Sequence, residues 1–223
     1  MIKKSSLVVS FLMVLFLGFG QTTSKKITFQ PRISNESIEL NKVYALNDSV
    51  QLEITTCRFY VSNFSFLSKG KLVSQQKSAF LLDLEHPTSL DLSFPSTEFD
   101  GIQFNLGIDS STNVAGILDG DLDPINGMYW TWNSGYINFK LEGTYAVKNA
   151  AKIPFEYHLG GYLSPYPTLQ TISVETEQSE SIVIQLDLQQ FISAIDINSC
   201  SNVMIPGAKA VELSKLLSNC FKI

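Results

Sequence analysis

Short runs in which apolar and polar residues alternate recur along the chain, and they constrain the fold more than any other feature. β-Branched and aromatic residues fill the runs, while Gly, Pro, Asn and Asp cluster between them. A period of two is typical of strands with one buried face. The runs are residues 27–30, 50–66, 78–84, 89–94, 101–106, 135–145, 153–159, 169–174 and 181–188. This pattern predicts an all-β protein, with a bulge or bend near Arg58, where the alternation of the longest run shifts.

Helical periodicity is confined to short stretches. Residues 106–115 could hold a helical turn, and a longer helix is predicted after Pro206-Gly207. In that helix Ala208, Val211, Leu213, Leu216 and Leu217 follow a helical period. No repeat or linker tract divides the chain, and about 200 residues suit one β-sandwich domain. We therefore predict a single domain over residues 21–223, an antiparallel β-sandwich with a short C-terminal helix.

The first 20 residues have the pattern of a secretory signal peptide. Lys3 and Lys4 precede an apolar run over residues 7–19, and small and polar residues follow at 20–24. The run is shorter than the roughly 20 apolar residues that span a bilayer, although a short membrane anchor is the alternative. Without a second apolar span, we expect no transmembrane helix in the mature chain. The predicted location is the periplasm, the outer-membrane surface or the medium.

Charge and motifs exclude several classes of function. The net charge of −5 argues against binding to nucleic acid, because phosphate recognition needs a basic face. The chain has no Gly-x-Ser-x-Gly elbow, no phosphate-binding glycine loop and no Cys-x-x-Cys motif. We therefore expect a binding protein rather than an enzyme, and regard a hydrolase as the least supported reading.

The cysteines predict one disulfide. An exported protein can keep disulfides, but the three cysteines leave one thiol over. Cys200 and Cys220 bracket the predicted C-terminal helix, and a helix that returns against its own entry strand could bring them together. We predict the bridge Cys200–Cys220. Cys57 lies within an alternating run, where it would be a small buried hydrophobe.

The segment 119–136 is the most unusual part of the sequence. It holds both tryptophans, Trp130 and Trp132, which would point to one face if the segment is a strand. Large aromatic residues of this kind usually fill a core or its rim. The three carboxylates Asp119, Asp121 and Asp123 begin like a calcium loop, but the remaining positions do not fit an EF-hand. A looser Ca²⁺ site near them and an ordinary solvated turn remain as alternatives.

Several fragments in order carry a resemblance to a known family. The most specific are Gly127-Met-Tyr-Trp-Thr-Trp-Asn-Ser-Gly-Tyr136, Lys140-Leu-Glu-Gly143 and Phe155-Glu-Tyr-His-Leu-Gly160. Weaker matches lie at residues 59–63, 81–89, 101–109 and 203–206. Together they resemble the MbnP-like domain family, copper-binding proteins named for the methanobactin cassette. The resemblance covers nearly all of the mature chain.

The resemblance implies copper binding outside the cytoplasm and a redox partner. Family members are often paired with a MauG-type di-haem cytochrome c peroxidase, which can oxidise a tryptophan to kynurenine, and the new amine can help to bind copper. Here the modified residue would be Trp130 or Trp132. His158, in the Tyr-His-Leu-Gly block, is the best imidazole ligand, and His86 carries over more weakly.

Ligand chemistry adds Met128 and Met204 as candidates, because thioethers and imidazoles suit copper, especially Cu(I). For each of these residues the ordinary alternative is a structural role, as a hydrogen-bonded histidine or a methionine that fills the core.

Two functions therefore remain open at this point. The first is an exported copper carrier or scavenger. The alternative is a non-catalytic adhesion or partner-binding β-sandwich that uses the aromatic loop of Trp130 and Trp132. Proximity of His158 to another candidate ligand or to a tryptophan ring would favour copper, whereas exposed tryptophans and distant histidines would favour adhesion.

Overall fold

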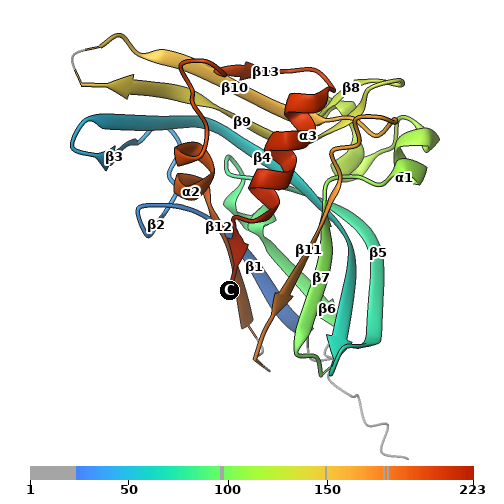
Figure 1. Cartoon of the computed structure of the whole chain (residues 1–223). Coiled ribbons are helices and arrows are strands. Elements are labelled where there is room, and N and C mark those ends of the chain that lie inside the picture. Colours follow the sequence, from blue (N-terminus) through green and yellow to red (C-terminus); the bar gives the residue numbers. More distant parts are fainter. Residues whose placement is uncertain (1–23, 96–97, 149, 178, 180) are drawn as a thin grey trace, which may run out of the picture.

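Two β-sheets build the molecule, with helices at the open side between them (Figure 1). The computed structural model describes residues 24–223 except 96–97, 149, 178 and 180. The predicted signal peptide lies outside this range. The strands are β1 Ser24–Ile33, β2 Glu36–Ser37, β3 Val43–Asn47, β4 Val50–Ser68, β5 Lys71–Asp83, β6 Asp91–Pro95, β7 Gly101–Leu106, β8 Tyr129–Thr131, β9 Gly135–Val147, β10 Ile153–Gly160, β11 Gln170–Glu175, β12 Ser181–Asp187, β13 Asn202–Val203 and β14 Phe221–Lys222. The helices are α1 Ser110–Ala115, α2 Leu188–Ser193 and α3 Ala208–Ser218, with short 3₁₀ turns at η1 Pro87–Leu90, η2 Gly120–Leu122 and η3 Pro124–Asn126.

Strand β4 is the spine of the larger sheet. Its first part, Val50–Phe59, pairs with β9, and its second part pairs with β7 from Val61 onward. On its other edge it pairs first with β3 and then with β5. The register shifts at Ile54/Thr56 and again after Ser62. The predicted irregularity is thus present as two register shifts, one before Arg58 and one after it. Strand β4 bends at this point and runs through both halves of the sheet.

The smaller sheet has the order β14-β12-β1-β2, with β6 also paired to β1. An all-β sandwich is therefore confirmed, but the prediction of purely antiparallel sheets is wrong for two pairs. Strand β1 runs parallel to β12, and β10 runs parallel to β13. Both pairs join strands that are distant in sequence, so no tight hairpin fixes their direction.

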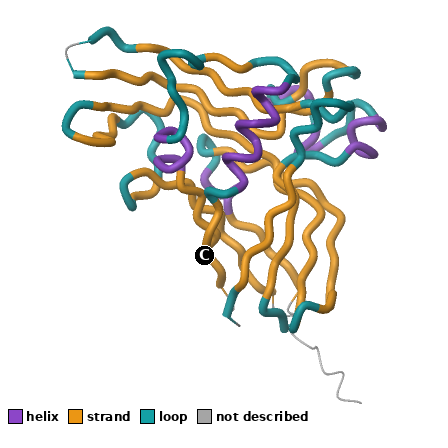
Figure 2. Tube along the Cα trace, viewed as in Figure 1, coloured by secondary structure: helices purple, strands orange, loops and turns teal. Residues whose placement is uncertain are grey.

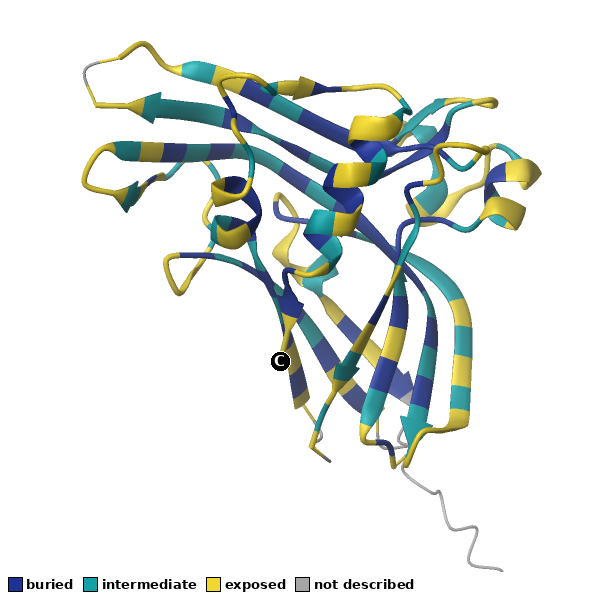
Figure 3. Cartoon of the chain, in the orientation of Figure 1, coloured by how far each residue is buried: buried dark blue, intermediate teal, exposed yellow. Residues whose placement is uncertain are grey.

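Aromatic side chains fill the space between the sheets. Phe64 is fully buried and meets Phe29, Phe94 and Phe104 at centroid distances of 6.4, 4.7 and 5.6 Å. The alternation of buried and exposed residues along the strands follows the predicted pattern (Figure 3). Helix α3 closes the open side with Leu213 and Leu217, as its period predicted.

Helix α2 is a feature that the sequence pattern missed. It begins where the β12 pattern was expected to continue, because the Asp187 carboxylate accepts a hydrogen bond from the Gln190 backbone N–H and caps a new helix. Among the described residues, no helix is long and apolar enough to cross a membrane.

All three cysteines lie in the described part of the chain, and each is a free thiol. The predicted bridge Cys200–Cys220 is therefore not formed. Cys200 precedes β13 in the larger sheet, whereas Cys220 precedes β14 in the smaller sheet. Helix α3 lies between them, and its 11 residues extend about 16 Å. The Cys220 thiol faces the Leu216 carbonyl instead, at 3.4 Å.

These environments predict that one thiol reacts before the other two. Cys57 is fully buried, and burial raises the pKa of its thiol; burial also raises the pKa of Cys220 to about 11. Cys200 is only half-buried. A thiol-specific reagent should therefore modify Cys200 in the native protein and all three after unfolding, because the thiolate is the reactive form. Counting modified thiols by mass spectrometry checks this, and a native protein that yields none would argue for the bridge.

Candidate functional site

The candidate site lies on the face of the larger sheet that points away from the smaller sheet. Along β10, Phe155, Tyr157 and Leu159 belong to the core between the sheets. Because side chains alternate along a strand, Glu156 and His158 point to the opposite face. Neighbouring strands supply that face with polar groups in register. We call the surface formed by Thr56, Arg58, Lys140, Glu142, Glu156 and His158 the outer face.

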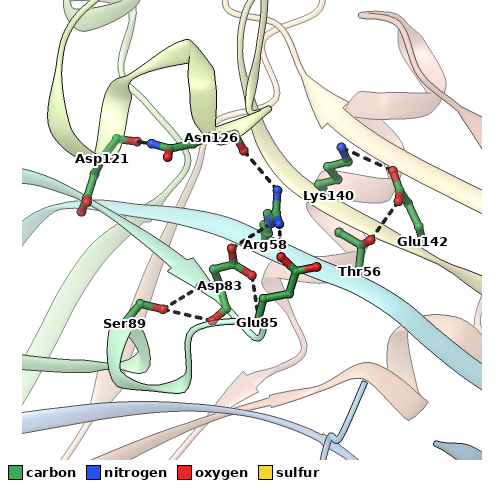
Figure 4. A network of polar contacts seen from close by, with 9 residues as sticks. All are labelled: Thr56, Arg58, Asp83, Glu85, Ser89, Asp121, Asn126, Lys140 and Glu142. Atoms are coloured by element: carbon green, nitrogen blue, oxygen red, sulfur yellow. Dashed lines mark hydrogen bonds and ion pairs between the residues drawn. The ribbon is translucent and has the colours of Figure 1, made fainter. Parts of the chain in front are cut away.

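His158 is held on the outer face by a carboxylate. Its Nε2 atom lies 2.7 Å from Oε1 of Glu142, and the histidine is only 6% exposed. The hydroxyl of Thr56 donates to the other carboxylate oxygen at 2.9 Å, and Nζ of Lys140 lies 3.4 Å from Oε1 (Figure 4). Within the described residues, Nδ1 of His158 makes no hydrogen bond. The arrangement fixes the ring and leaves one nitrogen able to take a ligand.

Glu142 is ionised in this setting. Burial acts to raise the pKa of its carboxyl, but hydrogen bonds from His158 and Thr56 and the charge of Lys140 outweigh burial and hold the pKa below its usual range. A carboxyl whose pKa is lowered on folding stabilises the fold above its unfolded pKa, and this contribution is lost as the pH falls through the folded pKa.

We therefore expect Glu142→Gln to lower stability most above about pH 5, because an unfolded glutamate titrates near 4.3. The gap between the variant and the wild-type protein should narrow as the pH falls toward 3. Urea midpoints across this range, with Glu156→Gln as a neighbouring control, measure the effect. A gap that stays constant with pH would show that Glu142 acts through packing alone.

Trp130 lies against the same face of β10. A Cβ atom placed on Gly160, two residues after His158, would come within 2.8 Å of Cζ3 of the Trp130 ring. The bulge at this point is in β9, since Leu159 and Gly160 pair with Phe139 and Ile137, so β10 keeps its alternation. The indole ring therefore packs on the outer face, at the position next to His158 on that side of the strand.

Trp132 has a different environment from Trp130. Strand β8 ends at Thr131, so Trp132 lies in the following turn with 78% of its surface exposed. The expectation that both rings share one face depended on a longer strand, and it is wrong for this reason. Of the two tryptophans, Trp130 is the one whose ring packs on β10, over Gly160.

Met204 is the second candidate ligand near His158. Strand β13 pairs in parallel with β10 through Asn202↔Glu156 and Val203↔Tyr157, and Met204 follows directly after the last paired residue, on the side of β10 that leads to His158. The Asn202 amide donates to the Glu156 carboxylate at 3.0 Å and contacts the Met204 sulfur at 3.4 Å. These contacts place the thioether on the outer face as well.

The other two predicted ligands have different surroundings from Met204. Met128 is fully buried in a second apolar cluster with Tyr60, Tyr136 and two isoleucines, against which Trp130 packs. His86 is exposed at the start of η1, beyond the end of β5. Strand β5 is three strand spacings from β10, about 14 Å, because β4 and β9 lie between them. The structure does not bring His86 to His158.

An ion-pair network beside the site fastens the loop that leads to Trp130. Nε of Arg58 lies 2.9 Å from Oδ2 of Asp83, and its other nitrogens reach Glu85 and the Asn126 carbonyl (Figure 4). The Asn126 amide in turn donates to the Asp121 carbonyl at 3.1 Å. Arg58 therefore ties the loop 119–127 to the spine of the sheet.

The contacts of this loop do not support the Ca²⁺ site that was one alternative for Asp119, Asp121 and Asp123. Asp121 accepts a hydrogen bond from the Leu81 backbone, and Asp123 caps its own 3₁₀ turn. In the part of the chain that the structure describes, no three acidic, histidine or cysteine side chains are grouped as metal ligands.

Glu142 is the residue of the candidate site that sequence reasoning missed. It was present in the Lys140-Leu-Glu-Gly143 fragment but had no role assigned. A usable signal was available, because alternation in a strand places Lys140 and Glu142 on one face. Its partner His158 comes from a different strand, and the pairing of those strands is not visible in a local pattern.

Comparison with known proteins agrees with this fold. The model of the MbnP family matches residues 22–205. Among solved structures, MbnP from Methylosinus trichosporium is similar, with a TM-score of 0.61 and 14% sequence identity, over 84% of this chain and 86% of that chain. A comparison with curated proteins gives no match. The structural likeness at this identity shows the fold, and the family model covers most of the sequence. The chain therefore belongs to the MbnP family.

Proposed function

We propose that this protein is an exported copper-binding protein, a carrier or scavenger that acts in the periplasm, at the outer-membrane surface or in the medium. The observation that carries the proposal is the pairing of His158 with Glu142. Histidines that bind metals commonly donate their second ring N–H to a carboxylate, which fixes the tautomer and raises the basicity of the metal-binding nitrogen.

The donor set around His158 suits copper better than other metals. An imidazole and the thioether of Met204 are ligands that Cu(I) accepts, whereas Ca²⁺ and Mg²⁺ prefer several oxygen ligands. Zinc sites usually add further histidine, cysteine or carboxylate ligands, and no such group of three is found among the described residues. We propose His158 and Met204 as ligands and leave His86 out of the site.

The third donor in the proposal comes from a modified tryptophan. A di-haem cytochrome c peroxidase of the MauG type, with hydrogen peroxide as the oxidant, would convert Trp130 to kynurenine. The indole C2–C3 bond is cleaved, C3 becomes a ketone, C2 is released as formate after hydrolysis, and the arylamine that remains could join His158. Support for choosing Trp130 is its position over Gly160 on the outer face, in contrast to the exposed Trp132.

The two histidines provide a matched test of copper binding. His158→Ala should weaken Cu(I) binding at least about tenfold, because losing one of few ligands removes more than about 1.4 kcal/mol. His86→Ala removes the same chemical group from an exposed turn and should leave the affinity unchanged. Competition with a Cu(I) chelator measures both. Equal affinities for the wild-type protein and His158→Ala would remove His158 from the site.

The alternative function is a non-catalytic partner-binding or adhesion domain. The specific observation in its favour is the 78% exposure of Trp132, a large aromatic surface of the kind that anchors interfaces. If the protein fails to bind copper both before and after co-expression with the peroxidase, this alternative becomes the better account.

A further inference from the structure

One end of the molecule exposes several large apolar side chains. This end consists of α1, residues 116–127, the turn 131–135, residues 161–167 and residues 204–207, and we call it the loop end. Figure 2 shows loops gathering around α1 and β8 there. The exposed apolar residues are Val114 (71%), Ile117 (68%), Ile125 (87%), Trp132 (78%), Leu163 (52%) and Ile205 (73%). Single exposed residues are ordinary, but six on adjoining segments indicate an interaction surface.

Contacts between the segments show that the loop end is one surface. The Tyr162 hydroxyl donates to the Trp132 carbonyl at 3.0 Å. A Cβ on Gly135 would meet both Asn113 and Tyr162, and a Cβ on Gly161 would meet Pro206. The Tyr136 hydroxyl, next to the turn 131–135, also donates to the carbonyls of Gly116 and Leu122 at 3.1 and 3.0 Å. All five segments are therefore joined, and their exposed apolar side chains lie at one end of the molecule.

The charged side chains of the loop end itself are all acidic, and the cation that contacts its edge, Arg58, is already paired with Asp83 and Glu85. Residues 101–139 and 153–208 contain no lysine or arginine, although the whole chain has 16 of them. The loop end carries the carboxylates Asp119, Asp121 and Asp123. The nearest lysine in sequence, Lys209, is already paired with Glu212 at 2.7 Å. An apolar surface with an acidic rim is complementary to an apolar surface with a basic rim, and it would repel an anionic membrane.

We propose that the loop end is the docking surface for a protein partner whose own docking patch is apolar at its centre and rimmed by lysine or arginine. Taking this partner to be the di-haem peroxidase rests on the proposed function. Docking here would place the partner directly on Trp132, two residues from the less accessible Trp130. Trp132 then serves as a contact residue, and its exposure has an explanation independent of copper.

Binding of a purified MauG-type di-haem peroxidase tests the surface. Asp119→Lys should weaken binding at least about fivefold at low ionic strength, and the loss should fade as salt screens the charges. Ile125→Ser should weaken it by a similar factor at all salt concentrations. The controls are Asp48→Lys and Leu72→Ser, which make the same changes at exposed positions of the β3–β4 turn and β5, away from the loop end (Figure 1).

The outcomes separate the docking surface from copper binding. Losses confined to Asp119→Lys and Ile125→Ser support the proposal. Equal losses in the controls, or no binding by the wild-type protein at low ionic strength, overturn it. Copper titration of the same four variants is the second measurement, and it should give the wild-type affinity in each. A protein that binds copper but not the peroxidase would keep the copper function and reject the surface.

Discussion

Replacing Arg58 with alanine should lower the free energy of unfolding by about 3–5 kcal/mol, because it leaves a buried carboxylate without its partner. The side chain of Asp83 is only 9% exposed, and that of Arg58 is 20% exposed. The change also removes the hydrogen bond from Arg58 to the Asn126 carbonyl, which holds the loop 119–127 on the sheet. Urea unfolding of the two proteins measures the loss.

An exposed ion pair in the same protein is the matched control. Lys26 and Asp91 lie 2.8 Å apart, but their side chains are 51% and 39% exposed. Lys26→Ala should therefore cost less than about 1 kcal/mol. The double change Arg58→Met with Asp83→Leu removes both charges and should recover much of the stability lost in Arg58→Ala. Similar losses in Arg58→Ala and Lys26→Ala would contradict the assignment of a buried pair.

The Arg58→Ala variant should also change the surroundings of Trp130 in the candidate site. The loop 119–127 precedes β8, and β8 delivers Trp130 to the outer face beside His158. Loosening the loop should move the emission of the half-buried Trp130 toward that of a solvated indole, while Trp132 is already exposed. Comparing Arg58→Ala in Trp132→Phe and Trp130→Phe backgrounds assigns the change to one ring.

Much of the fold could be predicted because alternation reports which face of a strand is buried. Residues 101–106 and 153–159 coincide closely with β7 and β10, and the predicted C-terminal helix coincides with α3. The alternation of apolar and polar residues does not indicate which strands become neighbours or in which direction they run. The parallel pairs β1–β12 and β10–β13 could not be predicted for this reason, and neither could the separation of Cys200 from Cys220.

The candidate site could be predicted only in part for the same physical reason. His158 and the tryptophan segment stood out through their residue types and the family resemblance. Glu142, Thr56 and the register of Met204 depend on contacts across three strand pairs, which no local pattern contains. The difference between Trp130 and Trp132 depended on where β8 ends, and the boundaries of short strands are poorly determined by sequence patterns.

Co-expression with the di-haem peroxidase should convert Trp130 to kynurenine and leave Trp132 intact. Both indoles are electron-rich, so the expected difference in modification arises from where each ring lies in the structure. Trp130 packs over Gly160 next to His158, where an arylamine formed from it would face a metal ligand, whereas Trp132 faces solvent. Peptide mass spectrometry of the segment Tyr129 to Lys140 identifies the modified residue. Protein made without the peroxidase should carry two unmodified tryptophans.

Single substitutions identify which tryptophan is modified. At saturating peroxidase, Trp130→Phe should abolish the modification, and Trp132→Phe should retain it. The Cu(I) affinity of Trp130→Phe should then fall to that of the unmodified wild-type protein, because the same arylamine ligand is missing from both. Since imidazole and thioether donors remain in place, a residual affinity is expected from His158 and Met204. Kynurenine at position 132, or full copper affinity in Trp130→Phe, would move the site from the outer face of β10 to the exposed turn.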